Sequence, residues 1–340
     1  MGGGSGRPPA SSRRTALVGM GAAGLAAVAS PALVRGAAGQ TGEPWRVLVN
    51  FPPGGLLDGT ARLIADRAQR EAGRVPTVVE NRPGAGGNIG AAAAARARPD
   101  GRTVLASIDT PFTVNPHLYR DMGFDPAADL APVALVSSFP LVLLVHPGSG
   151  IADLAGLVAA ARARPPLFYT SAGNGSPGHL AMEHLRQTVG LPTGALENVP
   201  QRGNTEALTT LLAGTVQAGF LAIGGGPDLV RSGRLRALAV SGPRRDPALP
   251  EVPTVAEGGH PGFDVRIATV LMAPRGTPEA AVADWNALVR GVLDDPATAP
   301  RFADWGVQAE DGTAAAAEAW IRAGRERWGR VVRTAGMRAQ

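Results

Sequence analysis

The segment RVLVNFPPGGLLDGTARLIADRAQREA, residues 46–72, contains the pattern that decides the fold. Its first six residues are rich in Val, Leu and Phe and predict a buried strand. Apolar residues then recur near every 3.6 positions from residue 56 and predict a helix over 56–72. Two prolines and two glycines separate the two elements. A buried strand that leads directly into a helix is the repeating unit of an α/β fold.

The same alternation continues along the chain. Near the C-terminus, Thr277-Pro278 marks the start of a helix, since proline is favoured at the first helical position. We therefore expect an α/β fold that is rich in parallel strands, with binding sites at their carboxyl ends. Apolar runs predict the further strands over 76–80, 103–107, 133–137, 141–146, 167–171, 216–221 and 235–241.

The first 40 residues have the layout of a secretory signal peptide. Arg13-Arg14 precedes an apolar run rich in Ala and Gly over 16–29, and small residues suited to cleavage follow. The run is shorter than the roughly 20 residues that a membrane-spanning helix needs. The arginine pair leaves both general secretion and twin-arginine export open. We expect a mature protein that is periplasmic and soluble after removal of the signal peptide.

Charge and composition argue against several classes of protein. All 33 basic residues are Arg, and the formal net charge is +5. Four of these arginines lie in the first 38 residues, and the rest alternate with acids without forming a basic run. Nucleic acid is therefore not an expected partner. The chain has no Cys, which removes disulfides, thiolate metal sites and a lipid-modified cysteine from consideration.

Three glycine-rich turns each join a predicted strand to a predicted helix. Glycine lets the backbone approach a ligand closely, and the helix that follows directs unpaired N–H groups and a positive dipole end toward the same space. Such a turn prefers an anion, so a carboxylate needs no Lys or Arg there. A tight turn with nothing bound is the alternative for each one. The turns are PPGG at 52–55, PGAGGNIG at 83–90 and SAGNGSPGH at 171–179.

Motifs for catalysis are missing from the sequence. Ile89 stands where a dinucleotide fingerprint needs its third glycine, and Ser176 lacks the glycine two residues earlier that a hydrolase elbow requires. The five histidines show no metal-ligand spacing. We expect a binding protein without cofactor or metal. A periplasmic α/β hydrolase that acts on a carboxylate-containing small molecule is the alternative, which substrate turnover would support.

Several ordered motifs between about 46 and 336 carry a family resemblance. They are PPGG with Asp58, VVENRPGAGGNIGA at 78–91, PDGRTVL at 99–105, NPHLY at 115–119, SAGNGSPGHLA at 171–181, GRLRALAVSGPRRDPALPEVPTVAE at 233–257 and APRGTP at 273–278. In these motifs the chain resembles the tripartite tricarboxylate transporter substrate-binding proteins, also called Bug or TctC-like receptors.

The resemblance implies a two-lobe, Venus-flytrap fold of the type II periplasmic-binding-protein kind, with two mixed, mostly parallel sheets. Lobe 1 would comprise 43–142 plus 265–340, and lobe 2 would comprise 143–264, with hinges near 145–147 and 265–268. The implied ligand is a small organic carboxylate. The implied partners are the permease subunits of a tripartite tricarboxylate transporter or a sensor kinase, and the receptor itself would be a monomer.

The resemblance also implies two walls of a binding cleft. Asp109 and Thr110 are further candidates, whereas Asp58 suits a helix-dipole partner better than a ligand contact. Leu56, Leu57 and Leu221 stand where the family often has polar residues, so we expect a ligand with a more apolar body than a compact dicarboxylate. The wall residues are Pro53, Gly54 and Gly55 on one side and Ser171, Ala172, Gly173, Asn174, Gly175, Ser176 and His179 on the other.

Overall fold

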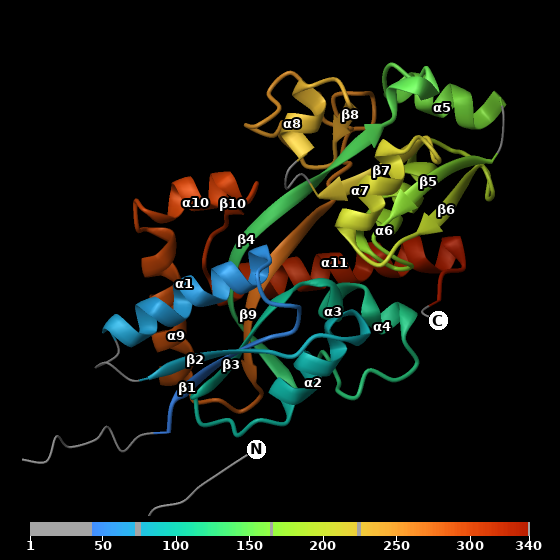
Figure 1. The fold of residues 1–340 in the computed structure, drawn as a ribbon. Coiled ribbons are helices and arrows are strands. Elements are labelled where there is room, and N and C mark those ends of the chain that lie inside the picture. Colours follow the sequence, from blue (N-terminus) through green and yellow to red (C-terminus); the bar gives the residue numbers. More distant parts are fainter. Residues whose placement is uncertain (1–42, 72–75, 164–165, 223–225, 339–340) are drawn as a thin grey trace, which may run out of the picture. The chain divides into compact units, whose positions relative to one another are not determined.

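One long strand organises the fold. The computed structural model describes residues 43–71, 76–163, 166–222 and 226–338, and the expected signal peptide at 1–40 lies outside them. Within this part, strand β4 runs over Leu130–Val145. Its first part pairs with β9 (Arg266–Pro274), and its last part pairs with β7 (Ala218–Ala222) and β8 (Arg236–Val240). β4 therefore belongs to two sheets, as Figure 1 shows.

Parallel strands form the outer part of each sheet. In the first sheet, β1 (Trp45–Val49) lies between β2 (Thr77–Asn81) and β3 (Thr103–Ile108), parallel to both. In the second, β5 (Leu167–Ser171) lies parallel to β6 (Leu196–Pro200) and to β7. The pairs that involve β4 or β9 are antiparallel, including the short β10 (Gln308–Ala309) against β4. Both sheets are thus mixed, and the expected α/β class is confirmed.

Helices follow most strands and begin where the turn chemistry predicts. The helix expected over 56–72 is α1, Leu56–Glu71, and the glycine turns at 83–90 and 171–179 lead into α2 and α6. No helix among the described residues is both long and apolar enough to cross a bilayer. The remaining helices are α2 (Asn88–Ala95), α3 (Thr110–Thr113), α4 (Asn115–Leu118), α5 (Leu154–Ala163), α6 (Pro177–Thr188), α7 (Asn204–Leu212), α8 (Gly226–Arg231), α9 (Glu279–Leu293), α10 (Thr298–Asp304) and α11 (Ala314–Ala335), with short 3₁₀ turns at Ala85–Gly87 and Pro147–Ser149.

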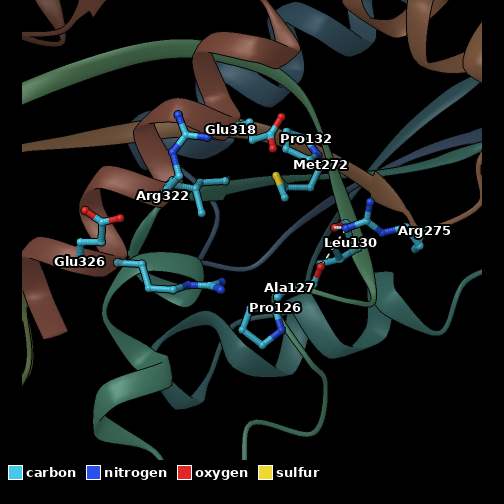
Figure 2. A pocket seen from close by; sticks show the side chains of 11 residues that line it. Pro126, Ala127, Leu130, Pro132, Met272, Arg275, Glu318, Arg322 and Glu326 are labelled. Atoms are coloured by element: carbon cyan, nitrogen blue, oxygen red, sulfur yellow. Dashed lines mark hydrogen bonds between the residues drawn. The ribbon is translucent and has the colours of Figure 1, made fainter.

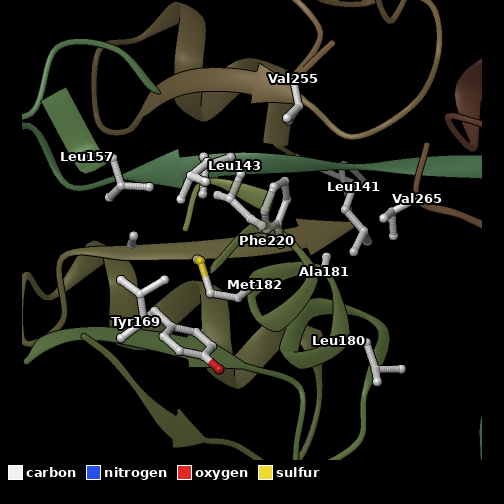
Figure 3. Close-up of a cluster of buried hydrophobic side chains, with 14 of the residues drawn as sticks. Leu141, Leu143, Leu157, Tyr169, Leu180, Ala181, Met182, Phe220, Val255 and Val265 are labelled. Carbon is white, nitrogen blue, oxygen red and sulfur yellow. The ribbon is translucent and has the colours of Figure 1, made fainter. Parts of the chain in front are cut away.

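Separate hydrophobic clusters stabilise the two sheets. In the first sheet, α1 and α9 pack with β1 and β3, and Trp285 is buried there with its indole N–H bonded to the carbonyl oxygen of Gly101. In the second sheet, Tyr169, Leu180, Met182 and Phe220 belong to one cluster, part of which Figure 3 shows. Burial of this apolar area is the main favourable term in folding.

Helix α11 contributes to hydrophobic clusters on both sheets. Ala317, near its start, packs in a cluster with strands of the first sheet. Trp328, Val331 and Val332, near its end, belong to the cluster of the second sheet instead. The lobe boundaries expected from the sequence assign all of 265–340 to lobe 1. The end of α11 nevertheless packs in the cluster of the second sheet.

The chain passes from one sheet to the other at two neighbouring points. β4 changes partners between Pro140 and Leu141, and the return passes through Val265 just before β9. Ser241 joins the two crossings, because its hydroxyl accepts from the Leu141 N–H (2.8 Å) and donates to the Val265 carbonyl oxygen (2.5 Å). The hinge expected at 145–147 lies beyond this point, since Val145 is still paired within the second sheet.

Candidate functional site

The turns at the ends of β1, β2, β3 and β5 form a connected group. A methyl group added at Gly87, in the turn after β2, would lie 3.1 Å from the Phe51 ring and 3.1 Å from Pro111. These two neighbours follow β1 and β3. A methyl group added at Gly175, in the turn after β5, would lie 2.5 Å from Cδ1 of Leu118 in α4. The turns predicted to carry the site are therefore linked by direct packing through α3 and α4.

The first predicted wall is open to solvent. Pro53, Gly54 and Gly55 are exposed, and a methyl group added at either glycine would meet nothing within 4 Å. The Gly54 N–H is already occupied, because it donates to Oδ2 of Asp58 at 3.0 Å. The helix start at Leu56 and the exposed face of Gly55 remain for a ligand to approach.

Asp58 holds this turn in place. Its carboxylate also accepts from Arg62 in the next helical turn and from Asn81 at the end of β2. Burial alone would raise the pKa of Asp58, but the hydrogen bonds from Arg62, Gly54 and Asn81 outweigh it and hold the pKa below its ordinary value. These contacts explain Asp58 as a residue that positions the turn.

The second predicted wall is held together by its own side chains. The Ser171 hydroxyl accepts from the Gly173 N–H at 3.3 Å, and Nδ1 of His179 accepts from the Gly175 N–H at 3.1 Å. Burial lowers the pKa of His179 to about 4, so the ring is neutral near pH 7 and carries its proton on Nε2. His179 is thus a neutral residue that shapes the turn, and its charge does not attract an anion.

Two helices start at this wall without side-chain caps. Ser176 precedes α6, yet its hydroxyl makes no capping bond and is a buried oxygen without a partner among the described residues. Gly203 precedes α7, and a methyl group added there would meet nothing within 4 Å. The Gln201 N–H donates to the Ser171 carbonyl oxygen, which ties the two turns together. Uncapped N–H groups at helix starts favour an anion.

The remaining wall residues differ in exposure. Asn174 is exposed and its side-chain oxygen accepts from Asn198, whereas Ala172, Gly173 and Gly175 are half-buried. Ser171 is fully buried at the end of β5, and Thr110 is buried at the start of α3. The structure therefore brings Ser171 to His179 together as one turn, with Thr110 on the neighbouring short helix.

Asp109 is engaged elsewhere, contrary to its assignment as a ligand contact. Its Oδ2 accepts from the indole N–H of Trp320 at 2.7 Å, and its Oδ1 faces the Ala268 N–H at 3.4 Å. Burial raises the pKa of Asp109 to about 6, although those hydrogen bonds oppose the shift. A buried carboxylate held between α11 and β9 is a structural link, so we remove Asp109 from the ligand-binding set.

Two of the three unusual leucines also face away from solvent. Leu57 is 5% exposed in the core around α1, and Leu221 is 1% exposed in the cluster around β8. Only Leu56 is half-buried beside the first turn. The expectation of an unusually apolar ligand therefore loses two of its three supports, because Leu57 and Leu221 pack inside hydrophobic clusters.

A buried polar network behind the turns was missed from the sequence. Asn50 donates to the Gly87 carbonyl oxygen and to the Ser107 hydroxyl, and Asn115 donates to the Gly86 carbonyl oxygen and to Asn88. These bonds fix the turn after β2. The sequence does contain an indication of this network. Asn50 directly follows a buried apolar strand, and a buried amide at that position needs hydrogen-bond partners.

Other candidate sites lie apart from these turns. A cavity of about 350 Å³ opens between α11 and the segment around Pro126, and Figure 2 shows that Arg275, Arg322 and Glu326 surround it. It contains no residue of the predicted walls. Among the described residues, no group of three His, Asp or Glu side chains is placed to hold a metal ion.

Known proteins resemble this chain in sequence and in fold. BugT of Bordetella pertussis is 35% identical over 297 residues, covering 86% of this chain and 90% of that protein. An R. palustris protein solved with adipate has a TM-score of 0.75 at 32% identity, covering 87% of this chain and 98% of that one. MatC from Rhodopseudomonas palustris, solved with bound malate, has a TM-score of 0.72 at 31% identity, covering 85% and 98%.

A family profile matches most of the chain. The profile described as the tripartite tricarboxylate transporter family receptor, TctC, matches residues 60–337. This range includes the second and third glycine turns, every strand except β1, and all of α11. The chain is therefore a member of the TctC or Bug family of periplasmic solute-binding receptors.

Proposed function

We propose that this receptor captures a small organic carboxylate between two lobes, 43–142 plus 265–340 and 143–264. One wall consists of Pro53, Gly54 and Gly55. The opposite wall runs from Ser171 to Ser176, with His179 shaping it and Thr110 beside it. The ligand stabilises the closed state only if it contacts both walls at once, since it shifts the equilibrium by its difference in affinity for the two states.

The observation that carries this proposal is the pair of uncapped helix starts at the second wall. The N-cap residues Ser176 and Gly203 make no side-chain capping bond. The first N–H of α6 is that of Gly178, because Pro177 has none, and the first N–H of α7 is that of Asn204. A ligand carboxylate supplies an acceptor for these groups and gains from the positive dipole ends. Relatives solved with adipate and with malate support the same class of ligand.

The place of this receptor in transport follows from the same proposal. We place the mature chain in the periplasm, as a monomer that delivers its ligand to the permease of a tripartite tricarboxylate transporter or to a sensor kinase. Neither step requires catalysis, a metal or a cofactor. Hydrolysis of a carboxylate-containing ligand by the purified protein would instead favour the hydrolase.

The test places a new charge at the first wall. Gly55 has open space for a side chain, so Gly55→Asp adds a carboxylate without a clash, and Gly55→Asn adds a neutral group of the same shape. Calorimetric titration with adipate and malate should show at least tenfold weaker binding for Gly55→Asp than for Gly55→Asn. Equal affinities for the two variants would contradict an anion site at this turn.

Stabilisation by the ligand provides a second measurement. A ligand at 100 times its Kd should raise the free energy of unfolding by about 2.7 kcal/mol. Thermal unfolding of the wild-type protein with each acid should therefore show an upward shift that Gly55→Asp loses and Gly55→Asn largely keeps. Absence of any shift with all small carboxylates would overturn the proposed ligand class.

A further inference from the structure

A second cavity has an apolar wall and a buried acid. It measures about 400 Å³ and lies between the segment that follows β8 and the α10–β10 region, whose elements Figure 1 labels. None of the residues proposed to hold the carboxylate lines it. Its lining consists of Asp246, Pro247, Ala248, Leu293, Thr298, Ala299, Phe302, Ala303, Asp304, Gly306, Val307, Gln308 and Ala309.

The charges of this cavity are all negative. Asp246 and Asp304 line it, no Arg does, and the chain contains no Lys. Asp246 is only 3% exposed, and in the described part of the chain it has no ion-pair partner. Within the described residues its carboxylate has one hydrogen bond, in which Oδ1 accepts from the Ala248 N–H at 2.8 Å. Burial raises the pKa of Asp246, with only this bond opposing the shift.

A buried carboxylate without a cation is energetically costly. Buried charges in proteins are normally paired or coordinate a metal ion. The bond to Ala248 shapes a local turn, but an Asn side chain would accept that bond equally well and carry no charge. The turn therefore does not account for an acid at this position. The feature left to explain is a negative charge on a buried residue that lines the cavity.

The rest of the wall defines the body of a suitable ligand. Leu293, Phe302 and Val307 provide apolar surface, while the polar lining besides the two acids is Thr298 and Gln308. A volume of this size lies in the range of small-molecule pockets, about 300–1,000 Å³. It suits a ring or a short branched chain rather than a bare ion.

We propose that this cavity binds a small organic cation, an ammonium group on an apolar body, with Asp246 as its counter-charge. The ammonium ion-pairs with Asp246, and the apolar body packs on Phe302 and Leu293. The cavity shares no residue with the two walls of the carboxylate site, although its lining comes from both proposed lobes. A titration with an ammonium ligand therefore tests it apart from the proposed receptor function.

The experiment is a calorimetric titration of the purified receptor with 2-phenylethylammonium, alongside 2-phenylethanol as a neutral analogue of similar shape. We expect the ammonium to bind at least tenfold more tightly than the alcohol. Asp246→Asn keeps the acceptor for the Ala248 N–H and should abolish this preference. Asp228→Asn, which removes an exposed acid of α8, should leave it unchanged.

A variant that fills the cavity tests whether the ammonium binds there. Ala303 is exposed and lines the cavity, so Ala303→Phe should block the ammonium while Asp246 is retained. No measurable binding of the ammonium to wild-type protein would overturn the proposal. Equal binding to the wild type and Asp246→Asn, or equal binding of ammonium and alcohol, would also overturn it.

Discussion

At the scale of single residues, Gly175 shows why the second wall needs glycine. Its φ is +73°, which side-chain-bearing residues rarely adopt, and an added methyl group would lie 2.5 Å from Leu118. Gly175→Ala should therefore lower the free energy of unfolding by about 2–4 kcal/mol, combining backbone strain with overpacking. Chemical denaturation measures the change.

A variant of a second glycine separates the cost of backbone strain from the cost of overpacking. Gly233 has nearly the same φ, +71°, but open space around an added methyl group. Gly233→Ala should therefore show the strain alone, about 1–2 kcal/mol. If both variants lost equal stability, the close contact between the turn and Leu118 would be refuted.

Asp109 makes the stability of the protein depend on pH. Its folded pKa of about 6 exceeds the ordinary value of 3.8, so its stabilising contribution is complete below pH 3.8 and is lost as pH rises through 6. Asp109→Asn imitates the protonated acid. The stability of wild type relative to this variant should fall by roughly 2–3 kcal/mol between pH 3.5 and 7.

A variant of Trp320 checks whether Asp109 is the group that titrates. Its N–H bond favours the ionised form of Asp109, so Trp320→Phe should move the transition to higher pH. Denaturation series across this pH range measure both effects. A constant difference between wild type and Asp109→Asn at all pH values would contradict the shifted pKa.

At the scale of elements, Ser241 ties the two strand crossings. Ser241→Ala leaves the buried Leu141 N–H without that acceptor and the Val265 carbonyl oxygen without that donor. The expected loss is about 1–3 kcal/mol, the cost of an unsatisfied buried polar group. Hydrogen exchange of the Leu141 amide should also accelerate.

Another buried serine, Ser137 of β4, is the matched control. Ser137 is fully buried in β4, and its hydroxyl has no partner among the described residues. Ser137→Ala removes an unsatisfied group, so it should leave stability unchanged or raise it. If Ser137→Ala lost as much stability as Ser241→Ala, general packing would be responsible, and not the two hydrogen bonds of Ser241.

The elements were predictable from sequence where turns separate them clearly. The proline and glycine pairs at 52–55 fixed the start of α1, and Pro177 fixed the start of α6. The sequence predicts two strands, 133–137 and 141–146, where the structure has the single strand β4. A proline inside a strand removes one donor from the ladder. The strand nevertheless continues through Pro140, which sits where the pairing changes from one sheet to the other.

The directions of side chains were harder to predict. Leu57, Asp109 and Leu221 stand beside turns in the sequence, and nothing local distinguishes a side chain that faces the ligand from one that faces the core. Each is buried by a distant segment: Leu57 packs with α9 and Asp109 bonds to Trp320. Only the long-range fold determines such contacts. The positions of the glycine turns could therefore be predicted from the sequence, but the directions of these three side chains could not.

At the scale of the whole molecule, α11 links the two halves near the chain's end. The ring of His184 in α6 stacks on Phe263 at 4.9 Å between centroids and lies edge-on to Trp328 of α11 at 6.2 Å. Gln187 of α6 also donates to the Val331 carbonyl oxygen. Movement of one half against the other must therefore either bend α11 or slide these contacts.

The shared strand β4 has a consequence for how the protein can be divided. Removing either half would strip β4 of its partners along one part of its length and expose unpaired backbone groups. Neither half is then a self-sufficient building block. The receptor should be made, tested and engineered as one indivisible piece, and fusions that swap a single half for that of a relative must exchange β4 at Pro140.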